Sequence, residues 1–396
     1  MATKRYIICL VMGKKLKNLL IITLFSTVPT FLIWFPFFLR IKSFWKIPIP
    51  QNGMATVVAN YDGPLFIVVA KTFYKPDLIE NFPFTLPTKY YAAHFPFYPN
   101  LIKFFSLITN FPYAMLLVTL LSSILTFYFF YNLISDHIEK KDLYWAIFTF
   151  AVFPARFLIV RSVGSPEPLF IATIIASLLY FKKGRFLLAG IWGAIATLTK
   201  PPGILLFLGY FLYIILLQLK NIATISFSRL NTEQNLKKIL PLSLIPLALL
   251  LVFTIFKIQM KDFLAYFHSG DNIHLFFPPF QIFNYSAPWV GTFWLEEILF
   301  VYLFVILGIY KLIQKKEYEY ASFTIIFFTS LIFIVHRDLI RYALPIVPLL
   351  FVAFSDTIVK KEFKIAMILL VIPIYLFSIT FISQNVMPIS DWTPLL

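Results

Sequence analysis

The sequence predicts an all-α integral membrane protein, with about eleven transmembrane helices and a single polytopic membrane domain over residues 1–396. Three observations lead to this prediction. The chain is 60% hydrophobic and 13% charged, with a mean hydropathy of +0.83, which is more apolar surface than one water-soluble domain buries. Nearly uncharged runs recur along the chain, each long enough as a helix to cross about 30 Å of hydrocarbon. These runs lack the period-two alternation of a membrane β-barrel.

The apolar runs define the spans in order along the chain. We interpret the first run as a retained anchor helix, because it is too long for a signal peptide and no small-residue cleavage site follows it. The single cysteine, Cys9, excludes an internal disulfide framework and a cysteine-based metal site. The predicted spans are 16–39, 113–132, 144–160, 168–181, 186–199, 202–219, 239–257, 297–313, 321–335, 342–355 and 365–383.

The connections between the spans differ in charge, and this difference predicts the orientation. One set is short and basic, as at Lys315-Lys316, and together with the N-terminus it carries most of the Lys and Arg residues. The other set contains two long loops, 40–112 and 258–296. The positive-inside rule therefore predicts an N-terminus inside, a C-terminus outside and both long loops on the extracytoplasmic side. The net charge of +16 follows from this topology and from anionic lipid surfaces, and no soluble domain is present to bind nucleic acid.

The first extracytoplasmic loop, 40–112, is dense in Phe, Tyr and Pro, a composition typical of juxtamembrane helices at headgroup level. Within residues 62–75, Leu65, Val69 and Phe73 recur every four residues and form one apolar stripe. This pattern predicts an interfacial helix that lies flat on the outer leaflet.

Polar side chains are costly inside a membrane, so their positions are informative. In this chain they gather at the predicted outer ends of the helices, and no span carries a series of acids or histidines through its middle. This distribution favours a site at the outer membrane surface over a proton path across the bilayer. The residues concerned are Asp62, His94, Arg161, Glu167, Lys200, His336, Arg337, Asp338 and Arg341.

The segment around the first acid has the sequence YDGPLFIVVAKTFY and begins at Tyr61. It resembles the W-D-[AG]-x-x-[YF]-x-x-I-A-x-x-G-Y signature of GT-C-type glycosyltransferases that use polyprenol-phosphate sugars. The resemblance is closest to the glycosylphosphatidylinositol mannosyltransferase 2 (PIG-V-like) family and its prokaryotic relatives. Asp62 falls on the acid of the signature, whereas Tyr61 replaces its Trp, Val69 its Ile and Phe73 its Gly.

Four further segments are similar to elements of the same family, in the same order along the chain. The stretch His94–Pro99 resembles F-F-P-x-Y-P, and Ser165–Phe170 resembles a Ser-Glu-x-x-Phe element interrupted by a proline. The stretch Ala196–Gly203 is similar to A-x-x-T-R-P-x-G, with Lys200 in the place of Arg. The last, Arg341–Pro348, matches R-Y-x-x-P-x-x-P.

The resemblance implies a multi-pass transferase of the cell membrane with its active site on the extracytoplasmic side. It implies an inverting transfer of mannose or another hexose from a polyprenyl phosphate to a hydroxyl of a glycolipid, glycan or protein, with no cofactor and no required metal. A carboxylate is needed as base for the hydroxyl, and cations are needed for the phosphate. The expected roles are catalytic for Asp62 and Glu167, phosphate-binding for Arg161, Lys200, Arg337 and Arg341, and supporting for Tyr61, His94, His336 and Asp338.

Each of these residues also has a simpler interpretation. Asp62 precedes a Gly-Pro pair and is a suitable turn former. Glu167 lies at a predicted helix start, where an acid interacts favourably with the helix dipole. Lys200 and Arg341 are placed to extend toward lipid headgroups, as cations at helix ends commonly do.

Two other functional classes remain open at the level of sequence. A transporter or a flippase for lipid-linked sugars fits the composition, although eleven spans do not divide into matching halves and the charges lie at one face. An inactive, lipid-binding copy of the enzyme also fits, because Tyr61 and Phe73 depart from the signature.

Overall fold

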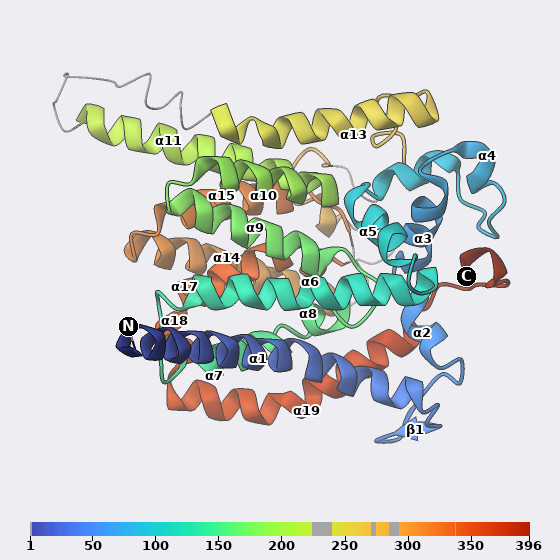
Figure 1. Cartoon of the computed structure of the whole chain (residues 1–396). Coiled ribbons are helices and arrows are strands. Elements are labelled where there is room, and N and C mark those ends of the chain that lie inside the picture. The colour runs from blue at the N-terminus through green and yellow to red at the C-terminus, as the bar shows by residue number, and fades with distance from the viewer. Residues whose placement is uncertain (1, 224–239, 271–274, 285–292, 337) are drawn as a thin grey trace.

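The structure is a computed structural model that describes all residues except 1, 224–239, 271–274, 285–292 and 337. In the described part the chain is mostly helical. Most of the long helices lie side by side with their axes roughly aligned, so that the bundle has two ends (Figure 1). Among the described residues, six helices are long and apolar enough to cross a membrane, which supports the predicted multi-pass helical protein. They are Leu16–Phe38, Phe111–Ile134, Pro201–Leu219, Leu240–Met260, Glu297–Gln314 and Lys361–Gln384.

The elements follow the chain in this order. The first half contains α1 (Ala2–Phe38), β1 (Ser43–Phe44), β2 (Ile47–Pro48), α2 (Met54–Val58), α3 (Gly63–Thr72), α4 (Pro76–Ile79), η1 (Thr88–Ala93), α5 (Phe97–Phe105), α6 (Phe111–Ile134), α7 (Leu143–Val152), α8 (Ala155–Val160), α9 (Glu167–Lys182) and α10 (Phe186–Thr199). The second half contains η2 (Pro201–Ile204), α11 (Leu205–Ala223), α13 (Leu244–Met260), η4 (Gln281–Phe283), η5 (Phe293–Glu296), α14 (Glu297–Gln314), α15 (Tyr318–Leu331), α16 (Leu339–Tyr342), η6 (Leu344–Ile346), α17 (Val347–Ala353), α18 (Ser355–Ile358), α19 (Lys361–Gln384) and η7 (Thr393–Leu395).

Each of the eleven predicted spans contains helix. The count of eleven crossings is not confirmed, because only six helices in the described part of the chain have the length and apolar composition of a full crossing. The predicted span 144–160 is broken between α7 and α8. Pro154 has no N–H, and Phe153 before it adopts an extended conformation. The predicted span 342–355 is likewise divided into short helices.

The centre of the bundle is α9, which is buried along almost its whole length and packs against α6, α10 and α15. A helix that is apolar on all sides is stable only when other helices surround it. Small residues such as Ala172, Ala176 and Ser177 let its neighbours approach closely. The position of α9 matters for the site, because its first residue is Glu167.

The helix predicted to lie flat on the outer leaflet differs from the expectation. Every residue of α3 except Lys71 is buried, including Ile67 and Val68 on the side away from the predicted stripe. The helix packs against α4, α5, α6 and the C-terminal η7. An interfacial helix would leave one face to lipid headgroups, so α3 belongs to the protein core. The exposed face in this region is provided by α5, where Phe104 is 63% exposed.

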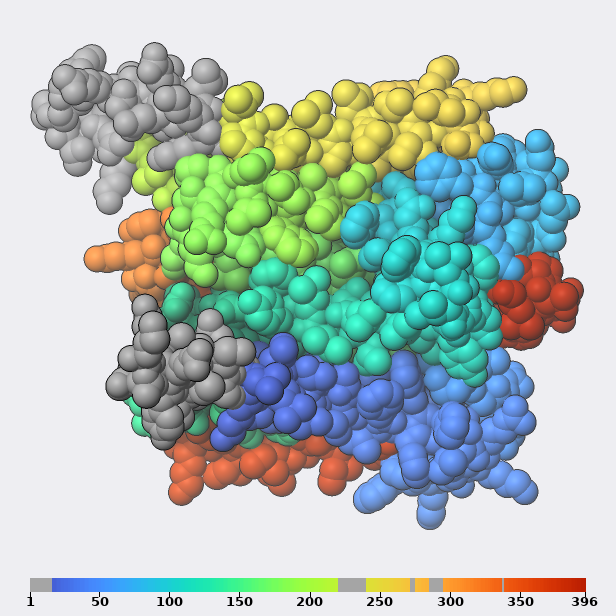
Figure 2. Space-filling model, viewed as in Figure 1, coloured from blue at the N-terminus to red at the C-terminus, as the bar shows by residue number. Residues whose placement is uncertain are grey.

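The C-terminal segment returns to the start of α3. The amide N–H of Met387 donates to the carbonyl of Ala59 at 2.7 Å, and the side chain of Asn60 donates to the carbonyl of Ile382 at 2.7 Å. Figure 2 shows the red C-terminal tail seated against the blue first loop at one end of the molecule. These contacts fix the chain immediately before Asp62.

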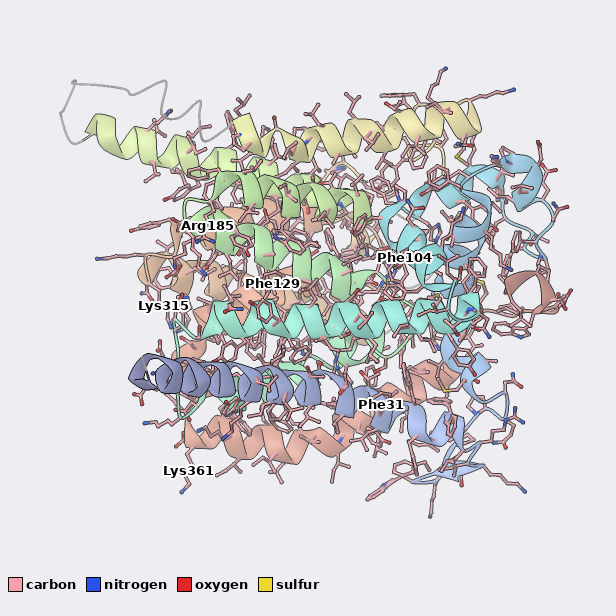
Figure 3. The ribbon with its side chains drawn as sticks, in the orientation of Figure 1. Phe31, Phe104, Phe129, Arg185, Lys315 and Lys361 are labelled. Atoms are coloured by element: carbon pink, nitrogen blue, oxygen red, sulfur yellow. The ribbon has the colours of Figure 1, made fainter. Side chains whose placement is uncertain are left out.

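The two ends of the bundle differ in composition. Figure 3 places Arg185, Lys315 and Lys361 at the end that also holds the N-terminus, whereas Phe104 lies toward the other end, with α3 to α5. The short basic connections therefore share one end, as the alternation of charge predicts. Which side of a membrane each end faces stays a prediction.

We expect the end with α5 to face outside the cell. In a chain whose native Cys9 is replaced by Ser, Lys103→Cys on α5 is expected to react with a membrane-impermeant maleimide in intact cells. Lys361→Cys, the matched control at the opposite end, is expected to react only after permeabilisation, because cytoplasmic connections are the basic ones. Both native side chains are exposed. The reverse labelling pattern would show that the predicted orientation is wrong.

Candidate functional site

Separate segments of the chain meet at one pocket at the end of the bundle that carries α3 and η1. The cavity has a volume of about 70 Å³. Its walls come from all five of the segments singled out in the sequence, which contribute the rings of Phe66 and Tyr342, and from Tyr90. Six of the predicted site residues line it, namely Tyr61, Asp62, His94, Glu167, Lys200 and Arg341.

Asp62 lies at the N-cap position of α3 but does not cap the helix through its side chain. Its backbone carbonyl accepts from the amides of Leu65 and Phe66 at 3.0 and 3.1 Å. Within the part of the chain that the structure describes, its carboxylate has no hydrogen-bond partner and no ion pair. Turn formation by the side chain therefore does not explain this acid, which lines the pocket with unused acceptor capacity.

Tyr61, the residue before this acid, is held on both sides. Its backbone is left-handed, with φ of 49°, and its hydroxyl accepts a hydrogen bond from Arg156 Nη1 at 3.0 Å. The guanidinium of Arg341 lies over its ring at 4.5 Å from the centroid, and the ring of Phe381 lies at 5.6 Å. These contacts fix the peptide that leads into Asp62.

Glu167 occupies the first turn of α9, and the residue is 3% exposed. Its Oε1 lies 2.7 Å from Lys200 Nζ and 3.8 Å from Arg341 Nε. The hydroxyl of Ser165 donates to Oε2. The carboxylate therefore interacts with two cations from distant segments, in addition to the favourable effect of an acid at a helix start.

The protonation of Glu167 follows from these contacts. The residue lies outside the predicted span 168–181. Burial raises its pKa, but the charges of Lys200 and Arg341 and the hydrogen bonds outweigh this effect, so that the pKa is held at about 2. Glu167 is therefore ionised at neutral pH and compensates its two neighbouring cations.

The charges continue beyond the pocket as a chain. Asp338 Oδ2 lies 3.5 Å from Arg341 Nε, and Asp338 Oδ1 lies 3.2 Å from Arg156 Nε. Among the described residues neither Arg341 Nε nor Asp338 Oδ1 makes an aligned hydrogen bond. The described charged residues in and beside the pocket are three acids and three cations. As far as the described residues show, Arg341 Nε can still donate one hydrogen bond and Asp338 Oδ1 can still accept one.

Lys200 follows the last residue of α10, in an extended conformation with φ of −150° and ψ of 144°. Pro201 after it disfavours helix at this position. A side chain at Gly203 would come within 2.3 Å of the backbone nitrogen of Thr197, so the glycine allows the chain to fold back against α10. This local geometry directs the lysine side chain to Glu167.

The two predicted supporting histidines lie on different sides of the site. His94 is 4% exposed, with its ring 4.7 Å from that of Phe66. Burial lowers its pKa, an effect larger than the opposing one of Asp62, so the ring is neutral at neutral pH. His336 accepts a hydrogen bond at Nδ1 from the amide of Asp338 at 3.0 Å, which supports the acid beside Arg341. Arg337 lies outside the described residues.

The position of Arg161 does not fit the predicted phosphate-binding role. The residue is fully buried and does not line the pocket. Its guanidinium donates to the carbonyls of Ser26 and Ala151 and to Thr30 Oγ1 at 3.1 Å. Arg161 therefore joins α1 to α7 and α8 inside the bundle.

Arg156 was not among the predicted site residues, although it touches both Tyr61 and Asp338. It also lies over the ring of Phe381 at 4.0 Å. The signal in the sequence is an arginine inside the predicted span 144–160, where a charge is costly and needs a partner. The proline two residues earlier ends α7 and places this arginine on α8.

The acids and histidines near the pocket are residue types that bind metal ions, provided that several of them surround one point. In the part of the chain that is described, no group of three or more His, Cys, Asp or Glu side chains is placed to hold a metal ion. Glu167 is instead paired with Lys200 and Arg341, which compete with a metal for its oxygens.

Comparison with known proteins gives distant likenesses among solved structures alone. No family model matches the chain, and no curated protein matches it. Among solved structures it is similar to the crystal structure of the Archaeoglobus fulgidus oligosaccharyltransferase in complex with Zn and sulfate, with a TM-score of 0.46 and 15% identity. The match covers 93% of this chain and 54% of that one, so the chain spans about half the length of this neighbour. A likeness of this size carries no argument about activity.

We expect Glu167→Gln to destabilise the protein, because it leaves Lys200 and Arg341 without their acid. Removing one partner of a buried pair costs about 3–5 kcal/mol. Because its folded pKa is depressed, Glu167 contributes stability that is present above about pH 4.5, the ordinary value, and lost as the pH falls toward 2. In the Gln variant, the stability is expected to no longer include the decrease between pH 4.5 and 2 that protonation of Glu167 causes.

The measurement is thermal unfolding in detergent between pH 7 and pH 2. The matched control is Glu80→Gln, which changes an exposed acid of the same loop region and is expected to leave the unfolding temperature unchanged. Equal unfolding temperatures for Glu167→Gln and the unaltered protein at pH 7 would contradict the prediction.

Proposed function

We propose that the protein is a GT-C-type membrane glycosyltransferase that transfers a sugar from a polyprenyl-phosphate donor to a hydroxyl acceptor. One observation carries the proposal: five segments that resemble elements of one family line a single pocket, although they lie far apart in the chain. Such convergence is expected when the segments serve one site. Mannose or another hexose is the donor sugar that the resemblance favours.

Asp62 is the proposed general base. The acceptor oxygen forms a bond to the anomeric carbon while its proton moves to the Asp62 carboxylate. The bond from the anomeric carbon to the phosphate oxygen breaks, and the electron pair leaves with the polyprenyl phosphate. Attack from the side opposite the leaving group inverts the configuration. A base needs a free lone pair within reach of the proton. The carboxylate of Asp62 meets the first requirement as far as the described residues are concerned, since none of them donates to it.

Lys200 and Arg341 are the proposed phosphate ligands. As the leaving phosphate departs it gains negative charge, which preorganised cations stabilise. The ammonium of Lys200 has three donors, of which Glu167 Oε1 takes one, and Arg341 Nε is not used in an aligned hydrogen bond among the described residues. In this proposal Glu167 is a positioning residue that fixes both cations. Arg337 stays a candidate from the sequence alone.

The site is proposed to face the extracytoplasmic side, where the lipid-linked donor and an acceptor on a glycolipid, glycan or protein meet. The cavity of about 70 Å³ has the space of a few water molecules and no room for a polyprenyl chain. The lipid part of the donor therefore remains in the surrounding bilayer. Nothing in this mechanism requires a metal ion or another cofactor.

Asp62→Asn is expected to lower the rate of transfer about 10²- to 10⁴-fold, because Asn keeps the shape but does not accept the proton. The assay uses protein in liposomes with polyprenyl-phosphate mannose and other hexoses, and mass spectrometry of the glycosylated products. The matched control is Asp77→Asn, an exposed acid on α4, which is expected to keep full activity.

The acceptor for this assay is found by mass spectrometry of lipid-linked saccharides in cells with and without the protein. Full transfer by Asp62→Asn would contradict the proposed mechanism. Sugar uptake or lipid scrambling in liposomes, without any covalent product, would instead support a transporter.

Arg156→Lys is expected to lower kcat by about ten- to a hundredfold with little change in KM, because small displacements of a catalytic group have effects of this size. Lys keeps the charge opposite Asp338 but loses the forked geometry that also serves the hydroxyl of Tyr61. Tyr61→Phe is expected to have a similar effect, and the double variant no greater one. Additive losses would show that the two residues do not act through one contact.

A further inference from the structure

A second cavity lies on the flank of the bundle, between α1 and α19, and shares no lining residue with the candidate site among the described residues. Its volume is about 850 Å³. The walls are apolar side chains, among them Leu24, Val28 and Leu32 of α1 and Ile372 of α19. Figure 2 shows the blue surface of α1 next to the red surface of α19 along the lower part of the view.

The position of this groove indicates that a hydrocarbon chain occupies it. Both α1 and α19 are among the helices that are long and apolar enough to cross a membrane. Leu32 is 53% exposed and Ile372 is 55% exposed in the isolated chain. Where hydrocarbon surrounds the protein, polar chain segments without partners do not enter such a groove. The lining from Ile21 to Phe35 extends about 21 Å along α1, which is sufficient for an acyl chain of one leaflet, about half of 30 Å.

One end of the groove carries positive charge. The loop after α1 contributes Phe44 and Trp45 to the lining, and the same loop contains Arg40, Lys42 and Lys46, all exposed. No acid occurs between residues 39 and 61. None of the three cations forms an ion pair with a described residue.

This end of the groove also has the character of a membrane interface. Trp45 is 70% exposed, and tryptophan is enriched where hydrocarbon meets headgroups. At the hairpin side of the groove, the hydroxyl of Tyr375 on α19 donates to the carbonyl of Leu32 at 2.7 Å, and its ring lies 5.8 Å from that of Phe44. A phosphate at this level would complement the cations while its chain lies along the helices.

We propose that the groove between α1 and α19 binds one anionic phospholipid, with an acyl chain along α1 and the phosphate against Arg40, Lys42 and Lys46. The bound lipid fills the space between two helices that contact each other directly at few points. This site is separate from the proposed sugar transfer, and it holds or fails independently of that activity.

The test measures lipid binding by native mass spectrometry of the full chain, released from nanodiscs that contain equal amounts of dioleoyl phosphatidylglycerol and dioleoyl phosphatidylcholine. Phosphatidylglycerol is expected to remain bound at a ratio of one per chain and in excess over phosphatidylcholine. Val28→Trp, which fills the groove, is expected to reduce retention at least tenfold. The matched control is Leu250→Trp, because Leu250 on α13 is 51% exposed and does not line the groove.

The charge part of the proposal has its own variants. Replacement of the three loop cations by Gln is expected to weaken phosphatidylglycerol binding about fivefold for each cation removed, and to leave phosphatidylcholine binding unchanged. The matched control replaces three exposed cations of the basic end, Lys140, Lys183 and Arg185, by Gln and is expected to have no effect. If Val28→Trp does not elute as a monodisperse protein, Leu24→Trp takes its place.

Any of the following results would overturn the proposal. The first is equal retention of the two lipids by the unaltered chain, or equal loss in Val28→Trp and Leu250→Trp. The second is displacement of phosphatidylglycerol by an equimolar polyprenyl phosphate, which would assign the groove to the donor lipid. The third is a dimer that Val28→Trp dissociates, which would identify the groove as a contact between two copies of the chain.

Discussion

The ionised carboxylate of Glu167 is buried at the start of the central helix α9. A buried charge needs compensating charges nearby, and this need organises the site. Lys200, at the end of α10, places its Nζ 2.7 Å from Glu167 Oε1, and Arg341 of α16 places its Nε 3.8 Å from the same oxygen. An unpaired charge at such a position costs several kcal/mol. Three segments that are far apart in the sequence are therefore held at one point, and the proposed phosphate ligands are fixed before any ligand arrives.

The two carboxylates of the pocket have different surroundings, and this difference separates their roles. Glu167 has two cations and a hydroxyl as partners, which keep it ionised and make it a poor proton acceptor. Asp62 lines the same pocket without a described partner for its carboxylate. Pairs of acids whose environments differ in this way commonly divide structural and chemical tasks.

The position of Asp62 depends on contacts outside the pocket. Asn60 and Tyr61 are held by the C-terminal part of the chain and by Arg156, respectively. Asp338 links this support to Arg341. The base and the cations of the proposed mechanism thus belong to one connected set of contacts, in which a change at α8 reaches Asp62 through a single tyrosine.

Composition and the long apolar runs determined that this is a multi-pass helical membrane protein, because in hydrocarbon every backbone group needs an internal partner and such runs become helices. The cost of charge near a membrane, together with the motif resemblance, predicted Asp62, Glu167, Lys200 and Arg341 as site residues, and the four line one pocket. Only the tertiary structure decided that Arg161 bonds to carbonyls of the core, that Arg156 belongs to the site and that α3 is buried. The physical reason is that the partner of a cation at a helix end depends on which distant segment packs beside it, and local sequence does not contain that information.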